Sequence, residues 1–472
     1  MRLTETRRAA AEQHPLLQRP YRFRLLAILL AANTLNFVDR AILSAVVEPM
    51  RLELGMSDSQ IGLLQGLAFA VTYAVIGIPV GRLAERHNRL RIVALCVIFF
   101  SIATGLCGLA TGFFQLFVLR ILVGAGEGGF MAPASSVVAD HYPANRRASA
   151  LSIILLGMPL GFFFGSLLGG MIAQTYGWRM AFLAMATPGL VIAGLLIFAL
   201  REPPRGLAEG GKAGQTAAAP PALATVLRHL FGKPAFRHLL AGAVLCTCGA
   251  NAIGQFQFVY LLRVYQLELS QAGLISGTIS LLSLGIGMLL GGGGTDWLER
   301  RDRRWYLWVP AGGALIGAGF FALGFLVNQL VLAVPLIIAG GICLFLYFAP
   351  AYALVQNIAG VTMRASAVAI FGVFTGLLGA GLGPTIAGLA SDRIARSLFA
   401  GSDYGAQCRA GPAPEPGGLL DLACQDAAAT GMRGTLIAMT LFFIWGALHF
   451  LLASRTIDAA LGRREPGSST TP

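Results

Sequence analysis

Four charged residues lie within strongly apolar stretches of the sequence, namely Asp39, Arg40, Arg120 and Glu127. A charged side chain at the centre of a bilayer costs about 2.5–3.5 kcal/mol on insertion scales, so it is expected to face a partner or a polar cavity. Arg120 and Glu127 are seven residues apart, which places both on one face of a helix. We expect the two acids and the two guanidinium groups, whose charges sum to zero, to form ion pairs.

Such ion pairs fit two roles. They could be an inert lock between two helices, although apolar packing would serve at least as well there. A buried acid beside an arginine can instead be poised to bind and release a proton. Protonation of Asp39 or Glu127 would leave the cluster positive and able to hold an anionic headgroup. We therefore expect these acids to couple proton movement, and Arg40 and Arg120 to balance their charge or bind a headgroup.

These residues require a scaffold inside a membrane. The chain has 472 residues, of which 56% are hydrophobic and 12% are charged, and its mean hydropathy is +0.70. Soluble proteins carry roughly 25% charged residues, so a soluble enzyme, a collagen-like chain and a disordered scaffold are excluded. A membrane helix needs about 20 apolar residues. The sequence therefore predicts an all-α polytopic membrane protein.

The twelve predicted transmembrane helices lie near residues 22–47, 58–82, 90–111, 113–139, 148–174, 178–200, 236–262, 270–294, 304–327, 330–358, 365–391 and 432–454. The predicted domains are an N-terminal tail (1–21), a first six-helix bundle (22–200), a linker (201–235), a second six-helix bundle (236–455) with an outer loop (391–431), and a C-terminal tail (456–472). Within the linker, apolar residues recur with helical spacing from Leu223. This pattern predicts a short helix that either lies on the membrane surface or packs on the bundle.

The distribution of basic residues predicts the orientation. Most of the 35 Lys and Arg residues lie in segments that share one side of the membrane if both tails are cytoplasmic. We expect a bacterial inner membrane with both termini in the cytoplasm. The net charge of +13 follows from this distribution, so it does not indicate a nucleic-acid partner. The six histidines are scattered, so we expect no metal site, no cofactor and no enzymatic centre, and a channel is also disfavoured.

A short motif occurs in both halves, after the second and the eighth span. The first copy contains Gly81, Glu85, Arg86 and Arg91, and the second places Asp296 four residues after a glycine and before a basic run. This repetition indicates an internal duplication. The glycine would allow helices to approach closely, and the acid would pair with a neighbouring base to hold an inner gate shut. An ordinary positive loop is the alternative.

Uncharged polar residues mark the walls of a possible cavity. Asn33 and Asn36 share the helix face of Arg40. The second half offers few such residues, namely Asn251, Gln255, Tyr347, Gln356 and Asn357. The first half of the chain would thus give the cavity a charged wall, and the second half would give it a largely apolar wall. Such a cavity suits a substrate with an anionic or zwitterionic head and an alkyl tail.

Glycine recurs at every fourth position in the fifth predicted span, at Gly157, Gly161, Gly165 and Gly169. We call this repeat the glycine ladder. It is typical of close helix contact, although a transport-direction motif is an alternative.

Two cysteines, Cys408 and Cys424, lie in the predicted outer loop, where an oxidising compartment allows a disulfide. Closing a loop of that size can contribute about 3 kcal/mol, so we expect these cysteines to pair, with two free thiols as the alternative.

The duplicated gate motif and the arrangement of twelve spans around a central loop resemble the major facilitator superfamily. Within it, three segments resemble the Spinster family: Asn33 to Arg40, Arg120 to Glu127, and Gly379 through Pro384 to Arg393. Glu85 departs from this pattern, because Asp is usual there. The resemblance implies twelve transmembrane helices in two pseudo-symmetric six-helix bundles. It also implies a monomeric, proton-coupled carrier of lysophospholipids or sphingosine-1-phosphate that works by alternating access among membrane lipids. The acid–arginine pairs also resemble those of proton-coupled symporters for small organic anions such as sugar acids, which remains the alternative.

Overall fold

The computed structural model describes residues 14–209, 222–360, 363–410 and 417–461, and these residues form helices and no strand. The predicted tails and the middle of the linker therefore lie partly outside the described residues. Twelve of the described helical stretches are long and apolar enough to cross a membrane, in agreement with the sequence. Several of these spans consist of two consecutive helices, because glycine or a local irregularity interrupts them.

The helices of the first half are α2 (Arg19–Leu54), α3 (Asp58–Gln65), α4 (Leu67–Arg86), α5 (Arg89–Cys107), α6 (Phe113–Gly128), α7 (Met131–His141), α8 (Ala144–Leu155), α9 (Gly157–Tyr176) and α10 (Trp178–Phe198). Those of the second half are α11 (Leu223–Phe231), α12 (Pro234–Tyr265), α13 (Leu269–Glu299), α14 (Trp305–Leu326), α15 (Leu330–Phe345), α16 (Phe348–Ala359), α17 (Arg364–Phe374), a π-helical segment (Thr375–Gly381), α18 (Leu382–Leu398), α19 (Leu419–Met439), α20 (Leu441–Ser454) and α21 (Ile457–Leu461).

Contacts divide the chain into two compact units whose boundaries differ from those of the predicted bundles. Unit 1 comprises Met1–Ala218, Gly254–Leu281 and Pro384–Thr435. Unit 2 comprises Ala219–Ile253, Leu282–Gly383 and Leu436–Pro472. Unit 1 therefore contains the helices of the first half together with parts of α12 and α13 and most of α18 and α19.

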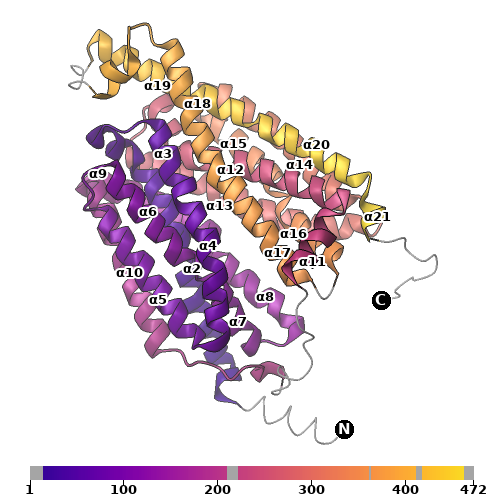
Figure 1. Cartoon of the computed structure of the whole chain (residues 1–472). Helices are drawn as coiled ribbons and strands as arrows, with labels where there is room; N and C mark the ends of the chain where they lie inside the picture. Colours follow the sequence, from indigo (N-terminus) through magenta and orange to yellow (C-terminus); the bar gives the residue numbers. More distant parts are fainter. Residues whose placement is uncertain (1–13, 210–221, 361–362, 411–416, 462–472) are drawn as a thin grey trace, which may run out of the picture. The chain divides into compact units, whose positions relative to one another are not determined.

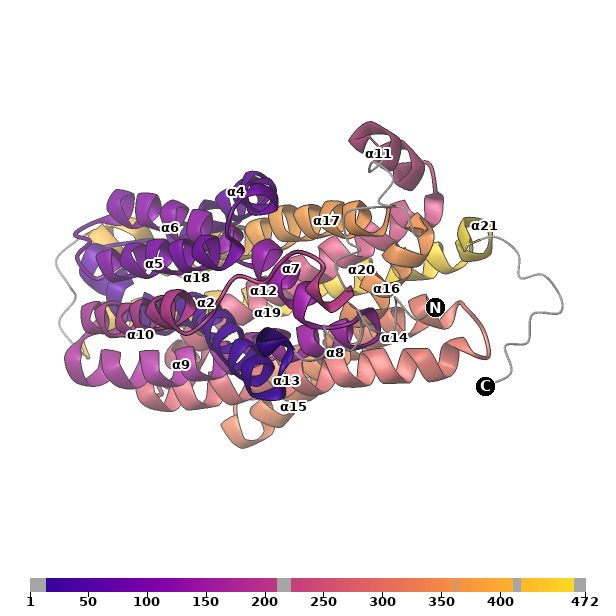
Figure 2. The ribbon, with the colours of Figure 1, turned by 90° about the horizontal axis from the view of Figure 1, so that it is seen from below.

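Within unit 1, the long helices pack side by side (Figure 1). α5 lies between α6 and α10 (Figure 2), and α9 packs along α2. The glycine ladder of α9 makes the contact with α2 possible. A Cβ atom at Gly165 would lie 2.7 Å from the carbonyl oxygen of Val38, and one at Gly161 would lie 2.5 Å from Cβ of Phe37. The ladder thus serves close packing in this structure, because only glycine leaves room for the α2 backbone.

Substitution within the ladder should therefore destabilise the protein. Gly161→Ala is expected to cost about 1–3 kcal/mol, since the added methyl group overpacks the contact with α2. Gly194→Ala is the matched control, because nothing lies within 4 Å of a Cβ there. Thermal unfolding of the detergent-solubilised protein should show a lower midpoint for Gly161→Ala alone. Equal midpoints for both variants would contradict the packing role.

The predicted outer loop is largely helical. α18 continues to Leu398 and α19 already begins at Leu419, so the connection is shorter than predicted. Phe399 and Tyr404 pack with residues of both helices, and Cys408 and Cys424 form a disulfide. These contacts let both helices extend beyond the ends expected from hydropathy.

The predicted linker helix corresponds to α11 in unit 2. Its buried residues Val226 and Leu230 lie on the side that packs against α16 and α17, which supports packing on the protein rather than on the membrane surface. Lys233 follows the helix, and its ammonium group donates hydrogen bonds to the carbonyl oxygens of Ile358 and Ala460, both at 3.0 Å. Burial lowers the pKa of this lysine.

Candidate functional site

Helix α2 carries a stripe of polar residues along one face. Their spacing of three or four residues keeps them within about a third of the helix circumference. The stripe consists of Asn33, Asn36, Arg40, Ser44, Glu48 and Arg51. All six residues belong to unit 1, and four of them contribute to two groups of charged residues. We call the group around Arg40 the bundle cluster and the group around Glu48 the helix-end network.

The first ion pair of the bundle cluster joins α2 to α6. Arg120 Nη1 lies 2.9 Å from Asp39 Oδ2, and both residues are at most 3% exposed. The hydroxyl of Thr104 in α5 donates to the other carboxylate oxygen, Oδ1. Both oxygens of Asp39 therefore accept a hydrogen bond, which satisfies the acid within the protein interior.

The second ion pair of the bundle cluster is formed by Arg40 and Glu127. Arg40 contacts Glu127 Oε2 through Nε and Nη2, at 2.9 and 2.8 Å, and Nη2 also donates to Asn36 Oδ1 at 3.2 Å. Aromatic rings of Phe37, Phe69 and Tyr73 surround the guanidinium group, with centroids 4.4–5.0 Å from its carbon. The Arg40 side chain is 20% exposed, whereas that of Glu127 is fully buried.

The two acids of the bundle cluster differ in their hydrogen bonds. Glu127 Oε1 is buried and has no hydrogen-bond partner among the described residues. The same holds for Arg120 Nε within this part of the chain. A buried polar atom without a partner is costly and uncommon in native structures. The two acids therefore differ, because only Asp39 has hydrogen bonds to both carboxylate oxygens within the described residues.

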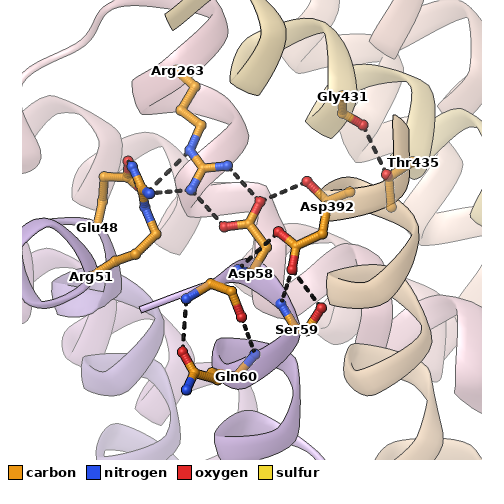
Figure 3. A network of polar contacts seen from close by, with 11 residues as sticks. Glu48, Arg51, Asp58, Ser59, Gln60, Arg263, Asp392, Gly431 and Thr435 are labelled. Atoms are coloured by element: carbon orange, nitrogen blue, oxygen red, sulfur yellow. Dashed lines mark hydrogen bonds and ion pairs between the residues drawn. The ribbon is translucent and has the colours of Figure 1, made fainter. Parts of the chain in front are cut away.

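The helix-end network is centred on Arg263 (Figure 3). Its guanidinium group binds Asp58 in a bidentate manner, at 2.7 and 2.8 Å, and also contacts Glu48 Oε2 at 2.8 Å. Arg51 donates to the other oxygen of Glu48 at 2.8 Å. These contacts fix the end of α12 to α2 and α3. Bidentate arginine–carboxylate pairs are among the strong hydrogen-bonded pairs in proteins.

Asp392 extends the helix-end network to α18. Its two carboxylate oxygens accept the backbone N–H groups of Asp58 and Ser59 at 3.1 and 3.0 Å, and Ser391 donates to Asp58 Oδ2 at 2.7 Å. A carboxylate at the start of a helix is favoured because the free N–H groups and the helix dipole point toward it. A capping box formed by Ser57 and Gln60 begins α3 at this position.

Glycines allow α3 and α18 to approach closely at the same place. A Cβ atom on Gly62 would collide with the carbonyl oxygen of Pro384, and one on Gly388 would collide with that of Asp58. Thr385 also donates to the carbonyl oxygen of Gly62 at 3.3 Å. The helix-end network is therefore supported by backbone contact as well as by charge.

The predicted cavity residues have different surroundings. Asn33 donates to the carbonyl oxygen of Ile154 at 2.8 Å and so holds α8, whereas Asn36 belongs to the bundle cluster. In unit 2, Asn251 donates to the carbonyl oxygen of Thr247 in its own helix. Tyr347 shares a hydrogen bond with the Thr247 hydroxyl at 2.9 Å.

The three remaining polar candidates differ in exposure and in the unit to which they belong. Gln356 and Asn357 are exposed on α16, and Gln255 belongs to unit 1, where it contacts Ser44. Among the second-half candidates, Asn251 and Tyr347 thus share a hydrogen-bond partner, Thr247. Their role as substrate ligands stays a prediction.

The charged residues of the predicted gate form no ion pair within the part of the chain that the structure describes. A Cβ atom added at Gly81 would lie 3.6 Å from Cβ of Ala132, which is an ordinary van der Waals distance. Glu85, Arg86 and Arg91 are exposed. Within the described ranges, neither Glu85 nor Asp296 takes part in an ion pair. Their role as gate residues therefore remains a prediction.

A third charged group lies next to this motif. Arg89 is buried and pairs with Asp140 at 2.5 Å and with Glu202 at 2.7 Å. Asp140 also accepts the backbone N–H of Gly206 at 2.8 Å, so the beginning of the linker is fixed to α5 and α7. This group anchors the chain after α10.

Sequence reasoning missed the helix-end network because its charged residues lie near predicted span ends. Two signals could have found the network. One is the continuation of the α2 stripe to Glu48, and the other is Asp392 within the motif that carried the family resemblance. Neither signal identifies Arg263 as the shared partner.

Comparison with known proteins agrees with this architecture. The model of the Major Facilitator Superfamily matches residues 29–384. An MFS-type efflux pump of Mycolicibacterium smegmatis is 31% identical over 383 residues, which cover 79% of this chain and 85% of the pump. The sphingosine-1-phosphate transporter SPNS2 of Danio rerio is 30% identical over 389 residues, which cover 78% and 76% of the two chains.

A solved structure is also similar. A bacterial homolog of the human lysosomal transporter Spinster, in an inward-facing and unoccupied conformation, superposes with a TM-score of 0.85. The two chains are 29% identical, and the match covers 95% of this chain and all of the other. These relatives are transporters, and the Spinster resemblance seen in the sequence is confirmed.

Proposed function

Because the chain belongs to the Major Facilitator Superfamily of multi-pass membrane transporters, we propose that it couples proton movement to the transport of an amphiphilic lipid. The lipid has an anionic or zwitterionic head, as in lysophospholipids and sphingosine-1-phosphate. The observation that carries this proposal is the bundle cluster, in which Arg40 is partly exposed while its partner Glu127 is buried. No cofactor other than the coupling proton is required.

The bundle cluster can exchange one anion for another. Glu127 Oε1 lacks a hydrogen-bond partner within the described structure, so protonation of this acid relieves an unfavourable arrangement. A neutral Glu127 no longer balances Arg40, whose guanidinium group then attracts the anionic part of a substrate. Asp39 keeps Arg120 in place through its own ion pair. Proton binding and substrate binding are thereby linked at Arg40.

The surroundings of Arg40 favour an amphiphile. Three aromatic rings surround the guanidinium group, and they offer apolar surface beside the charge. A sugar acid would need hydrogen-bond partners for several hydroxyl groups. The SPNS2 relative is named as a sphingosine-1-phosphate transporter, which supports the lipid class.

The orientation and assembly belong to the same proposal. The distribution of basic residues supports cytoplasmic termini, and we propose a bacterial inner membrane as the location. The carrier acts as a monomer surrounded by membrane lipids. Alternating access then moves the lipid from one side of the membrane to the other without chemical change.

Transport into proteoliposomes tests this function. Protein is reconstituted with lysophosphatidylcholine, sphingosine-1-phosphate or glucuronate as the probe, with and without a pH gradient. We expect saturable, gradient-dependent transport of at least one of the two lipids, and no transport by liposomes without protein. Saturable transport of glucuronate without any lipid transport would overturn the lipid assignment. Lipid transport that ignores the pH gradient would overturn the proton coupling.

A further inference from the structure

Three uncharged polar side chains meet inside unit 1. The hydroxyl of Ser44 in α2 donates to Gln255 Oε1 in α12. Gln65, the last residue of α3, donates from Nε2 to Ser44 Oγ at 3.2 Å and to the backbone oxygen of Gln255 at 3.5 Å. All three residues are at most 8% exposed. We call them the amide triad.

The amide triad lies between the two charged groups. On α2, Ser44 is one turn from Arg40 of the bundle cluster and one turn from Glu48 of the helix-end network. On α3, Gln65 is seven residues from Asp58, so both face the same side. The amide triad and the helix-end network therefore join the same three helices at successive levels.

The two sets of contacts differ in their response to pH. Acids of the helix-end network lose their charge when they bind a proton, and their attraction to Arg263 then weakens. Serine hydroxyl and glutamine amide groups do not change charge under physiological conditions. The charged groups that flank this region come from the two groups described above. They are Arg40 and Glu127 of the bundle cluster, and Glu48, Arg51, Asp58, Arg263 and Asp392 of the helix-end network.

We propose that Ser44, Gln65 and Gln255 form an uncharged latch that holds α12 on α2 and α3 whatever the protonation of the helix-end network. Protonation of the acids alone then leaves these helices joined. Separation requires the additional loss of the amide contacts, which prevents a proton from opening this end by itself. This proposal goes beyond the proposed function, because the latch acts on the protein conformation and does not depend on the substrate.

Distances between spin labels test the latch without any substrate. Labels are placed at Leu52 in α2 and Gln271 in α13, both exposed, after replacement of the five free cysteines. Gln255→Leu should raise the ratio of separated to joined conformations about 5- to 30-fold, since it removes buried hydrogen bonds and leaves polar partners unsatisfied. The increase should be the same at acidic and at alkaline pH.

Gln257→Leu is the matched control. Gln257 is also a buried glutamine of α12, but it donates to Ser276 of α13 at 3.0 Å, so its loss should not affect the contact with α2. Ser44→Ala deletes only a hydroxyl group and keeps the test valid if Gln255→Leu does not fold. An unchanged distance distribution in Ser44→Ala and Gln255→Leu would overturn the latch. So would an effect confined to acidic pH, or an equal effect in Gln257→Leu.

Discussion

In Glu127→Gln, substrate accumulation driven by a pH gradient is expected to fall about 5- to 150-fold. This is the usual range of coupling between two sites. Glutamine has nearly the same volume and still accepts a hydrogen bond from Arg40, but it cannot carry a proton. The fold should survive, because Oε1 of the native acid has no partner among the described residues that the substitution would remove. Counterflow of substrate, which needs no proton gradient, should continue.

Asp39→Asn is the informative companion variant. Both oxygens of Asp39 accept hydrogen bonds, from Thr104 and from Arg120, and the Arg120 charge is buried. Neutralising Asp39 leaves that charge without a counterion, which costs about 3–5 kcal/mol. The thermal unfolding midpoint should therefore be much lower in Asp39→Asn than in Glu127→Gln. Gradient-driven transport at the native level in Glu127→Gln would show that the bundle cluster is a structural lock.

Arg263→Met should destabilise unit 1 by about 3–5 kcal/mol, because it leaves Asp58 as a buried carboxylate without its cation. Glu48 keeps Arg51 as a partner and is affected less. Methionine retains much of the apolar stem, so the loss reflects charge rather than volume. Removal of both members of a buried pair is often nearly neutral. Arg263→Met combined with Asp58→Asn should therefore recover much of the stability.

A double-mutant cycle of thermal unfolding measures this coupling. Arg179→Met is the control, since Arg179 pairs with Glu53 at the surface and its loss should cost no more than about 1 kcal/mol. Additive losses for Arg263→Met and Asp58→Asn would show that the two residues act independently. The bidentate contact would then not hold the end of α12 in place.

The number of spans and the residues of the bundle cluster could be predicted from the sequence alone. Hydropathy is a property of each segment, so twelve apolar stretches indicate twelve membrane helices without any knowledge of their neighbours. A charged residue within such a stretch is equally visible, which identified Asp39, Arg40, Arg120 and Glu127. The glycine ladder similarly predicted close packing, although only the structure shows that α2 is its partner.

Tertiary structure alone decided which residues pair. Arg263 and Asp58 are 205 residues apart, and each looks like an ordinary interfacial charge in its own segment. Gln255 is a polar residue one turn from Asn251, which predicted that it lines a cavity. In the structure its amide group contacts Ser44. Side-chain pairing depends on where several helices meet, and the polar pattern of a single helix cannot specify that meeting point. The sequence therefore determined which side chains need partners inside the membrane, and the packing of helices from distant parts of the chain decided which partners they have.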